Sequence, residues 1–457
     1  MAEEFDLVVI GGGPGGYAAA LYAAGAGMSV AVVEKDKVGG TCLHRGCIPA
    51  KHYLETASVF RTVAGAKVFG VHTEQPELDL GVSRDRKQKV VDQLWKGLQG
   101  LMKKRKIKTF DGTGSLGAGH LVTVDDGTEL HGTHVVLATG SVPRTIPGFE
   151  PDGEHILTSD HVLELDRLPA SAAVIGGGAI GCEFASMLAD LGCQVTLLEA
   201  LPKLLPGCDA DVVDVIVRSF RKRGMDVRTG VTVEGHEESN GQVTVKLGDG
   251  GSVTVDKVVV SVGRRPLTEG LGLEDTKVEV DDRGFISVDS HQRTAEEGVY
   301  AVGDVVATPQ LAHVGFAEAI VAVRDMRGED LEPVDYGKVP WCIYCHPEVA
   351  FAGMTEQAAR DAGHDVVVSK HSFNSNSRAM IIGETEGLVK VIAAKGGVIL
   401  GVHMVGPWVT EQLGEGWLSV NWEATPDDMG QLIHPHPTLS ETFGETVLTL
   451  TGRGLHG

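Results

Sequence analysis

Two cysteines, Cys42 and Cys47, lie five positions apart in residues 39–51 (GGTCLHRGCIPAK). In a regular α-helix, residues five apart have Cα atoms about 8.5 Å from each other, whereas a disulfide spans at most about 7 Å. A bond between these sulfurs therefore requires a distorted turn, for which Gly46 and Pro49 supply backbone freedom and a helix irregularity. A disulfide held in such a turn is more easily reduced than a structural one. We predict a working redox pair; the alternative is two buried thiols, the ordinary state of cysteine in a cytosolic protein.

A glycine-rich turn precedes the cysteine segment and has the Gly-x-Gly-x-x-Gly spacing, formed by Gly11, Gly13 and Gly16. The predicted flanking elements are a buried strand over 7–10, a helix over 17–26 and a strand over 29–33 that leads into Glu34. Such glycines admit a pyrophosphate to the helix N-terminus, and the acid accepts hydrogen bonds from ribose hydroxyls. The alternative is a tight turn with no ligand. Because strand, helix and terminal acid are in register, the sequence favours a dinucleotide site.

The same arrangement recurs with Gly176, Gly178 and Gly181. A strand that includes 174–175 precedes these glycines, a helix continues to 191, and a strand over 195–198 leads into Glu199. Two dinucleotide sites in one chain indicate one tightly held cofactor and one that exchanges. A carboxylate at the ribose favours a free 2′-hydroxyl, so Glu199 predicts NAD rather than NADP, with Lys203 as the only nearby cation in the sequence.

Composition limits the classes of protein to which the chain can belong. Its 457 residues predict about three domains, and an apolar content of 42% is enough for several cores. A formal charge of -22 disfavours nucleic acid and anionic membranes as partners, and no apolar run approaches the roughly 20 residues of a membrane span. The acidic N-terminus does not resemble a signal peptide, and seven irregularly spaced cysteines do not resemble a secreted disulfide framework. We therefore expect a cytoplasmic location.

A third segment completes a flavin site, and a fourth connects domains. Residues 299–302 predict a buried strand that closes on Gly303 and Asp304, and the carboxylate can bind ribityl hydroxyls. Residues 135–137 predict another buried strand, which runs into the small-residue turn 138–141. We interpret this fourth segment as a crossover between domains.

Six segments together resemble the class I pyridine nucleotide-disulfide oxidoreductases, and they occur along the whole chain in the order of that family. The cysteine segment and the C-terminal histidine segment are the most specific of the six. The segments are 39–51, Ala138-Thr139-Gly140, the second glycine turn, 261–266 (SVGRRP), Gly303-Asp304 and 434–441 (HPHPTLSE).

The resemblance implies an α/β fold with two Rossmann-like dinucleotide-binding domains and a C-terminal α+β dimerisation domain. We expect an FAD-binding domain over 1–145 and 270–335, with an NAD-binding domain over 146–269 inserted in it. Residues 336–457 would form the interface domain of a homodimer.

The resemblance also assigns roles in redox chemistry. Cys42 would be the interchange thiol that meets the substrate, and Cys47 the charge-transfer thiol over the flavin. Lys51 matches the family lysine near flavin N5, and Glu183 matches the acid expected to pair with it on the nicotinamide side.

A base is required because the thiolate is the nucleophile in disulfide exchange and an unperturbed thiol has a pKa near about 8.5. His436 matches the family base and Glu441 the carboxylate that holds its tautomer, acting from the partner subunit; imidazole suits this role at neutral pH. The repeated His-Pro pairs also offer His434, which we interpret as a supporting residue. The alternative for His436 is a histidine with no chemical role.

The expected cofactors are FAD and NAD, and no metal is expected. The FAD contacts implied by the motifs are Gly11, Gly13, Gly16, Glu34, Thr41, Lys51, Gly114, Thr139, Gly140, Ser141, Asp304, Gln310, Leu311, Ala312 and His313. The implied NAD contacts are Gly176, Gly178, Gly181, Glu199, Val231 and Gly263.

The implied activity is oxidation of a protein-bound dihydrolipoyl group, with a partner lipoyl domain from a 2-oxoacid dehydrogenase or glycine cleavage complex. The main alternative is an NAD(P)H-dependent reductase of a small disulfide of the glutathione or mycothiol type, which would usually prefer NADPH and is therefore disfavoured by Glu199. A mercuric reductase would carry a C-terminal cysteine pair, and a transhydrogenase would not need Cys42 and Cys47. A purely structural component of a complex would not need the intact redox set.

Two other features have ordinary explanations. Cys342 and Cys345 form a Cys-x-x-Cys that we interpret as two buried thiols rather than a second redox pair or half a zinc site. The basic run 103–108 (KKRKIK) is interpreted as the solvated end of a helix over 90–102 rather than a nucleic-acid patch.

Overall fold

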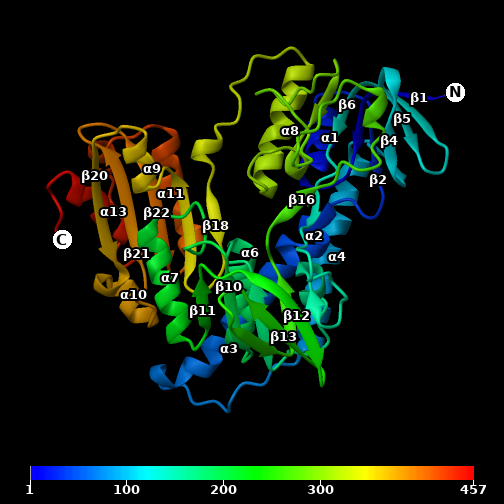
Figure 1. The fold of residues 1–457 in the computed structure, drawn as a ribbon. Coiled ribbons are helices and arrows are strands. Elements are labelled where there is room, and N and C mark those ends of the chain that lie inside the picture. Colours follow the sequence, from blue (N-terminus) through cyan, green and yellow to red (C-terminus); the bar gives the residue numbers. More distant parts are fainter. Residues whose placement is uncertain (1, 457) are drawn as a thin grey trace. The chain divides into compact units, whose positions relative to one another are not determined.

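The computed structural model describes residues 2–456 of the 457-residue chain. The chain divides into two compact units, whose elements are labelled in Figure 1. The first unit contains the residues up to Tyr53, Asp79–Arg144 and Arg264–Tyr336, and the second contains Leu54–Leu78, Thr145–Gly263 and the residues from Gly337 on.

A seven-stranded sheet forms the centre of the first unit. Its strands are β1 (Glu3–Ile10), β2 (Val30–Glu34), β3 (Lys108–Asp111), β4 (Gly114–Leu116), β5 (Leu121–Val124), β6 (Glu129–Leu137) and β17 (Val299–Ala301). The order is β3-β2-β1-β6-β5-β4, with β17 also paired to β6. The β1, β2, β3, β6 and β17 pairings are parallel, whereas β4, β5 and the start of β6 are antiparallel.

Helices and a short ribbon complete this unit. The helices are α1 (Pro14–Gly25), α2 (Gly40–Arg45), α4 (Leu80–Lys104) and α8 (Ala312–Met326), and α3 (Cys47–Gly65) begins here and continues into the second unit. The antiparallel ribbon pairs β7 (Ser141–Pro143) with β16 (Arg264–Pro266).

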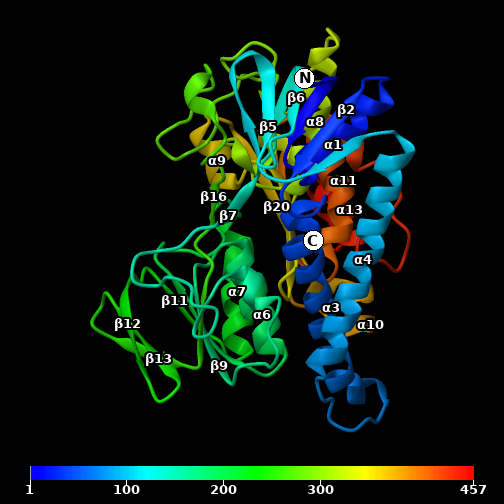
Figure 2. The same ribbon diagram turned by 90° about the vertical axis from the view of Figure 1, so that its right-hand side faces the viewer.

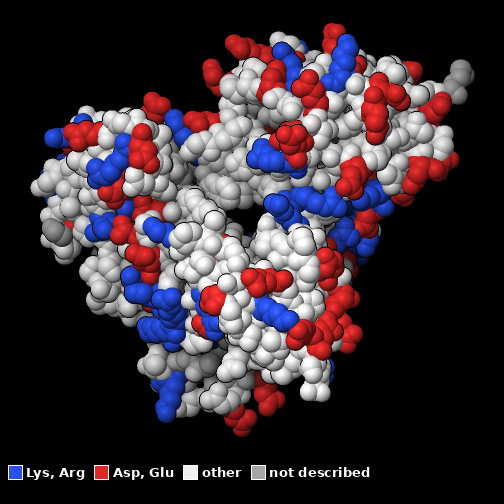
Figure 3. All heavy atoms as spheres, viewed as in Figure 1, with Lys and Arg blue, Asp and Glu red and all other residues white. Residues whose placement is uncertain are grey.

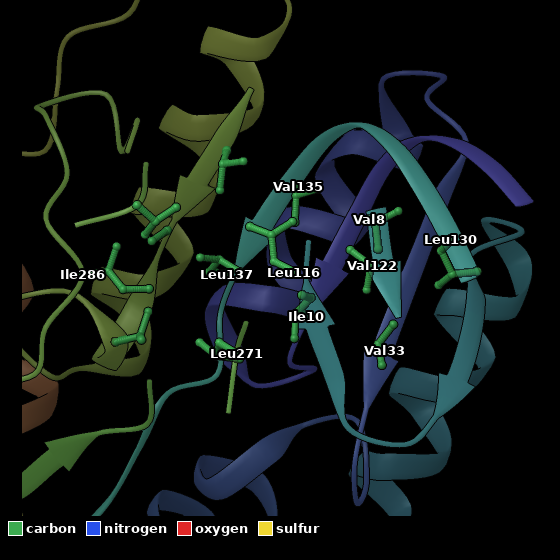
Figure 4. Packing of buried hydrophobic residues seen from close by; sticks show 14 of the residues in the cluster. Val8, Ile10, Val33, Leu116, Val122, Leu130, Val135, Leu137, Leu271 and Ile286 are labelled. Carbon is green, nitrogen blue, oxygen red and sulfur yellow. The ribbon is translucent and has the colours of Figure 1, made fainter. Parts of the chain in front are cut away.

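The apolar run at the start of the chain forms a strand that is buried on both faces, as expected for a central parallel strand. Val8 and Ile10 pack in one core with Val135 and residues of the β4–β5 hairpin, which Figure 4 shows. Leu7 and Val9 face the opposite side and pack in a second core, to which α1 and α8 contribute small residues. The strand thereby fixes the position of the glycine turn that follows Ile10.

One half of the second unit is built on a five-stranded parallel sheet with the order β11-β10-β9-β15-β8. Its strands are β8 (Ile156–Leu157), β9 (Ser171–Ile175), β10 (Gln194–Glu199), β11 (Asp226–Thr229) and β15 (Lys257–Val260), and its helices are α5 (Ser159–Val162), α6 (Ala179–Asp190) and α7 (Ala210–Lys222). Three antiparallel strands, β12 (Val233–Ser239), β13 (Gln242–Leu247) and β14 (Ser252–Val255), pack beside this sheet (Figure 2).

The C-terminal half of the second unit is an antiparallel sheet with the order β18-β19-β22-β21-β20 and helices packed against it. Its strands are β18 (Trp341–Ile343), β19 (Glu348–Gly353), β20 (Val366–Ser372), β21 (Leu388–Ala394) and β22 (Ile399–Gly406). Its helices are α9 (Glu356–Asp361), α10 (Ser377–Ile382), α11 (Val409–Asn421), α12 (Pro426–Met429) and α13 (Glu441–Leu450).

The predicted fold class, with two Rossmann-like sheets and a C-terminal α+β part, is confirmed by these three sheets. The structure divides into two compact units, so the boundaries of three separate domains stay a prediction.

The predicted helix over 90–102 is longer than expected, because Asp79 caps α4 by accepting a hydrogen bond from the Val82 amide. Its last turn carries Lys103 and Lys104, which confirms that the basic run begins at a helix end.

Acidic and basic side chains are interspersed on the face shown in Figure 3. No helix in residues 2–456 combines the length and the apolar character needed to cross a membrane.

Candidate active site

The two cysteines form a disulfide because the helix breaks between them. Helix α2 ends at Arg45, and α3 begins at Cys47. Gly46 between the helices has φ -141° and ψ -111°, and the Cα atoms of Cys42 and Cys47 are 4.7 Å apart. The predicted distorted turn is therefore confirmed at Gly46. Pro49 lies in the first turn of α3, where a proline costs no helical hydrogen bond.

The first glycine turn has the geometry of a nucleotide cradle. A Cβ on Gly16 would clash with the carbonyl of Gly11. Only glycine at position 16 therefore lets α1 approach the end of β1 this closely. A Cβ on Gly13 would meet nothing within 4 Å in the described part of the chain, so this glycine faces open space at the N-terminus of α1. Glu34 accepts hydrogen bonds from the amides of Gly12 at 2.6 Å and Asp36 at 2.9 Å. A carboxylate has further acceptor positions for ribose hydroxyls.

The second glycine turn repeats this geometry. A Cβ on Gly181 would clash with the carbonyl of Gly176, and a Cβ on Gly178 would meet no atom of the described residues within 4 Å. Glu199 accepts hydrogen bonds from the amides of Gly177 at 2.5 Å and Leu201 at 2.7 Å. Both cradles therefore fit a dinucleotide, because the space at the helix N-terminus and the acid at the end of the next strand are present in each.

Asp304 lies in a hydrogen-bonded network with two residues from the β7–β16 ribbon. The hydroxyl of Ser141 donates to the Asp304 carboxylate at 2.6 Å, and Arg264 donates to the hydroxyl and carbonyl of Ser141 at 2.7 Å each. The guanidinium lies 3.7 Å from the same carboxylate. The FAD contacts predicted from the sequence include Ser141 and Asp304. They do not include Arg264, although residues 261–266 were part of the resemblance.

The segment after Asp304 leads to the start of α8. The Gln310 amide donates to the Asp304 carbonyl at 3.4 Å, Leu311 is the N-cap residue, and Ala312 and His313 form the first turn. The fifteen-residue helix α8 therefore begins two residues after Gln310, and a helix N-terminus suits an anionic group. Glu318 on the same helix was missed by the sequence analysis.

Glu318 is fully buried and accepts hydrogen bonds from the Gly303 amide at 2.6 Å and the Tyr336 hydroxyl at 3.0 Å. Burial raises the pKa of its carboxyl. A glutamate inside an apolar helix carries no sequence signal of its own, because only the fold shows that it closes the Gly303 turn.

The structure also gives the local positions of the other predicted cofactor contacts. Thr139 donates to the Leu267 carbonyl at 2.6 Å, Gly140 has φ +71°, and Gly114 begins β4 and packs on Ile10 and Val33. Thr41 and Lys51 lie in α2 and α3. In the second unit, the Val231 amide donates to the Glu199 carbonyl at 3.0 Å, and Gly263 has φ +102°.

His436 has the geometry of a general base. Its Nδ1 lies 2.8 Å from the Glu441 carboxylate, which also accepts a hydrogen bond from the Thr438 amide at 2.7 Å. Because the carboxylate can only accept, Nδ1 carries the proton, and Nε2 of the neutral ring is left to accept one. The side chain is 72% exposed, and no group within residues 2–456 hydrogen-bonds its Nε2.

His434 is held differently. Its Nε2 lies 3.0 and 3.2 Å from the two carboxylate oxygens of Glu415, and its side chain is 14% exposed. The hydrogen bond to Glu415 raises the pKa of His434 above its usual value. Nε2 of His434 is therefore engaged by Glu415, whereas the His436 side chain is exposed; the choice of His436 as the base stays a prediction.

Lys51 and Glu183 belong to different units. Lys51 lies in α3 within the first unit, and Glu183 lies in α6 of the second. Glu183 is 6% exposed and accepts a hydrogen bond from the Tyr344 amide at 2.9 Å. The pairing of Lys51 with Glu183 stays a prediction.

Cys342 and Cys345 are not joined by a disulfide. The Cys345 thiol is buried and donates to the Pro347 carbonyl at 3.3 Å, and burial raises its pKa. A protonated, buried thiol is a poor nucleophile, so Cys345 has the structural character that was predicted. Cys342 is only partly buried, so the prediction of two buried thiols is wrong for this residue.

Comparison of the chain with known proteins identifies its family. Residues 5–319 match the pyridine nucleotide-disulphide oxidoreductase family, and residues 339–447 match the dimerisation domain of that family. Dihydrolipoyl dehydrogenase from Bacillus subtilis is 42% identical over all of both chains, and that from Thermus scotoductus is 40% identical over 99% of each. The crystal structure of LpdA from Mycobacterium tuberculosis has a TM-score of 0.91 at 27% identity and covers 98% of this chain and 100% of its own. The HOCl-induced flavoprotein disulfide reductase RclA from Escherichia coli has a TM-score of 0.87 at 28% identity and covers 97% of this chain and 99% of its own.

The chain therefore belongs to the pyridine nucleotide-disulphide oxidoreductases. It is a flavoprotein oxidoreductase with a disulfide redox centre, and the predicted cofactors FAD and NAD are confirmed by family membership. The matched dimerisation domain supports the predicted homodimer.

Proposed function

We propose that this chain is a dihydrolipoyl dehydrogenase, which oxidises a protein-bound dihydrolipoyl group and reduces NAD. The observation that carries the proposal is the Cys42–Cys47 disulfide directly after a nucleotide cradle. Full-length relatives with this name, at 38–42% identity, support the choice of substrate. The carboxylate of Glu199 at the second cradle supports NAD over NADP, because it would repel a 2′-phosphate.

The residues of the chain account for the thiol chemistry. Nε2 of His436 accepts the proton of a substrate thiol, and the resulting thiolate attacks Sγ of Cys42. The Cys42–Cys47 bond breaks, and Cys47 leaves as a thiolate. The second substrate thiol loses its proton to Cys42 by way of His436, and its sulfur attacks the substrate sulfur of the mixed disulfide. This step releases Cys42 as a thiol and closes the oxidised dithiolane. The FAD that the first glycine turn and Glu34 would hold would supply a two-electron carrier between the reduced cysteines and NAD.

The proposal includes four features that were predicted from the sequence. His436 and Glu441 act on the cysteines of the partner subunit in a homodimer. Lys51 and Glu183 act at the flavin and nicotinamide. The FAD-binding domain is 1–145 with 270–335, the NAD-binding domain is 146–269, and the interface domain is 336–457. The enzyme works in the cytoplasm with the lipoyl domain of a 2-oxoacid dehydrogenase or glycine cleavage complex.

The test compares substrates under steady-state conditions. The purified yellow holoenzyme is assayed with dihydrolipoamide and NAD, with dihydrolipoamide and NADP, and with NADPH and glutathione or mycothiol disulfide. The proposal predicts that kcat/KM is highest for dihydrolipoamide with NAD. A higher value for NADPH with a small disulfide would contradict it and would support the alternative reductase.

A further inference from the structure

One face of α6 carries Glu183, Ser186 and Asp190, which are three and four positions apart and therefore project from the same side of the helix. Each of these side chains is engaged by hydrogen bonds from outside α6. Glu183 and Ser186 bind the segment 344–346, which connects β18 to β19. All of these residues belong to the second unit.

The segment is attached to α6 at two points. The Tyr344 amide donates to the Glu183 carboxylate at 2.9 Å, and the His346 amide donates to the Ser186 hydroxyl at 2.9 Å. The two amides are two residues apart in the segment, and their acceptors are about one turn apart on the helix. A shift of the segment along α6 would therefore change both hydrogen bonds together.

Arg223 fixes the second of these points. Its guanidinium donates to the Ser186 hydroxyl at 3.2 Å and to the His346 carbonyl, so it binds the serine and the segment at once. It also donates to Asp190 at 2.5 Å, and Arg61 donates to the other oxygen of Asp190 at 2.5 Å. Ser186 is fully buried, and the Asp190 side chain is 4% exposed.

Two side chains of the segment, those of Cys345 and His346, carry no charge. Burial lowers the pKa of His346 to about 3, so its ring is neutral, and the Cys345 thiol is protonated and donates within the segment to Pro347. The Tyr344 amide is one of the groups that orient the carboxylate of Glu183.

We propose that Ser186 is a positioning residue for hydride transfer to NAD, because it holds the 344–346 segment whose amide orients the carboxylate of Glu183. This inference rests on the proposed role of Glu183 at the nicotinamide. It gives the Cys-x-x-Cys region a function without any redox role for its thiols. Ser186 itself touches neither substrate nor cofactor and acts through the segment.

The experiment measures the two half-reactions of the holoenzyme separately by anaerobic stopped-flow. Reduction by dihydrolipoamide involves the cysteines and should be unchanged in Ser186→Ala. Reoxidation by NAD should slow about 10- to 100-fold, since a misplacement of about 1 Å costs up to about 10²-fold in rate. The deuterium isotope effect with 4-deuterated NADH in the reverse direction should rise as hydride transfer becomes limiting.

Ser219→Ala is the matched control. Ser219 is 1% exposed in α7 and donates to Glu386 at 3.1 Å, so it is an equally buried, hydrogen-bonded serine that is not linked to Glu183. We expect it to lower the melting temperature without changing either half-reaction. Arg223→Gln provides a second variant, which leaves the Ser186–His346 bond in place and should slow only the reoxidation, by less than Ser186→Ala.

Glu183→Gln distinguishes a failure of the proposed role of Glu183 from a failure of the positioning role of Ser186. If Glu183→Gln leaves reoxidation by NAD unchanged, the proposed role of Glu183 is wrong. If Glu183→Gln slows reoxidation but Ser186→Ala and Arg223→Gln do not, the positioning role of Ser186 is wrong. Equal slowing of both half-reactions in Ser186→Ala would also contradict it, because that result indicates general structural damage.

Discussion

Replacement of Lys390 by methionine is expected to destabilise the second unit strongly. The Lys390 side chain on β21 is 2% exposed, and its Nζ lies 2.8 Å from Asp209, 2.7 Å from Asp211 and 2.8 Å from Glu356. Asp209 is itself 3% exposed at the side chain and is the N-cap of α7. Methionine keeps most of the apolar stem but leaves the Asp209 carboxylate buried without its cation.

The size of the expected loss of stability follows from the burial of the ion pair. Removal of one partner of a buried ion pair costs about 3–5 kcal/mol of unfolding free energy. Lys370→Met is the matched control, because Lys370 pairs with Asp211 at 3.0 Å but is 48% exposed. A pair of that kind contributes about 0.2–1 kcal/mol. Urea unfolding of the holoenzyme, followed by circular dichroism, should therefore give a much lower midpoint for Lys390→Met and a nearly unchanged midpoint for Lys370→Met.

The effect should depend on pH. Burial acts to raise the pKa of Asp209, but hydrogen bonds from Lys390 and the Glu356 amide hold it below its usual value. A carboxyl with a lowered folded-state pKa contributes stability above its unfolded pKa of about 3.9, and the contribution is lost as pH falls through the folded pKa. The difference between wild type and Lys390→Met should be largest near pH 7 and should shrink below about pH 4.

The double variant Lys390→Met/Asp209→Asn tests the cause. It should recover part of the lost stability, because no buried carboxylate remains at position 209 and asparagine still caps a helix. Equal small losses for Lys390→Met and Lys370→Met, or a difference that does not change with pH, would refute the reasoning.

The remaining predictions concern the site. His436→Ala should lower turnover with dihydrolipoamide by about 10²- to 10⁴-fold, whereas His434→Ala should mainly lower the melting temperature; equal losses of turnover would contradict the assignment of the base. Mixed dimers of Cys42→Ser and His436→Ala subunits should recover part of the activity, and no recovery would show that His436 acts within its own subunit. Glu199→Gln should raise KM for NAD and lower the ratio of kcat/KM for NAD to that for NADP, because a carboxylate no longer opposes a 2′-phosphate; an unchanged ratio would exclude this role.

The sequence predicted best those parts of the site that are local in the chain. Each glycine turn, with the strand before it and the acid that follows, lies within about 30 residues, as in a strand–helix–strand unit. The short distance from Cys42 to Cys47 likewise allowed the break at Gly46 to be predicted, since no regular helix brings those sulfurs together. The pair His436 and Glu441 is equally local.

The contacts that the sequence could not supply join distant segments. Arg264 binds Ser141 across 123 positions, and Ser186 binds the His346 amide across 160 positions. Neither serine has a local feature that separates it from an ordinary helix or strand residue. Only the packing of the sheets brings these groups together, so no spacing rule within one segment could reveal them.

Anaerobic reduction of the yellow holoenzyme with dihydrolipoamide tests the central claim most directly. With NAD withheld, we predict a long-wavelength absorption band from a thiolate of Cys47 beside the oxidised flavin. The band should be absent in Cys47→Ser and should keep its full intensity in Cys193→Ser, a control at a buried cysteine. The absence of this band in the wild-type enzyme, or its persistence in Cys47→Ser, would contradict electron transfer through the Cys42–Cys47 pair.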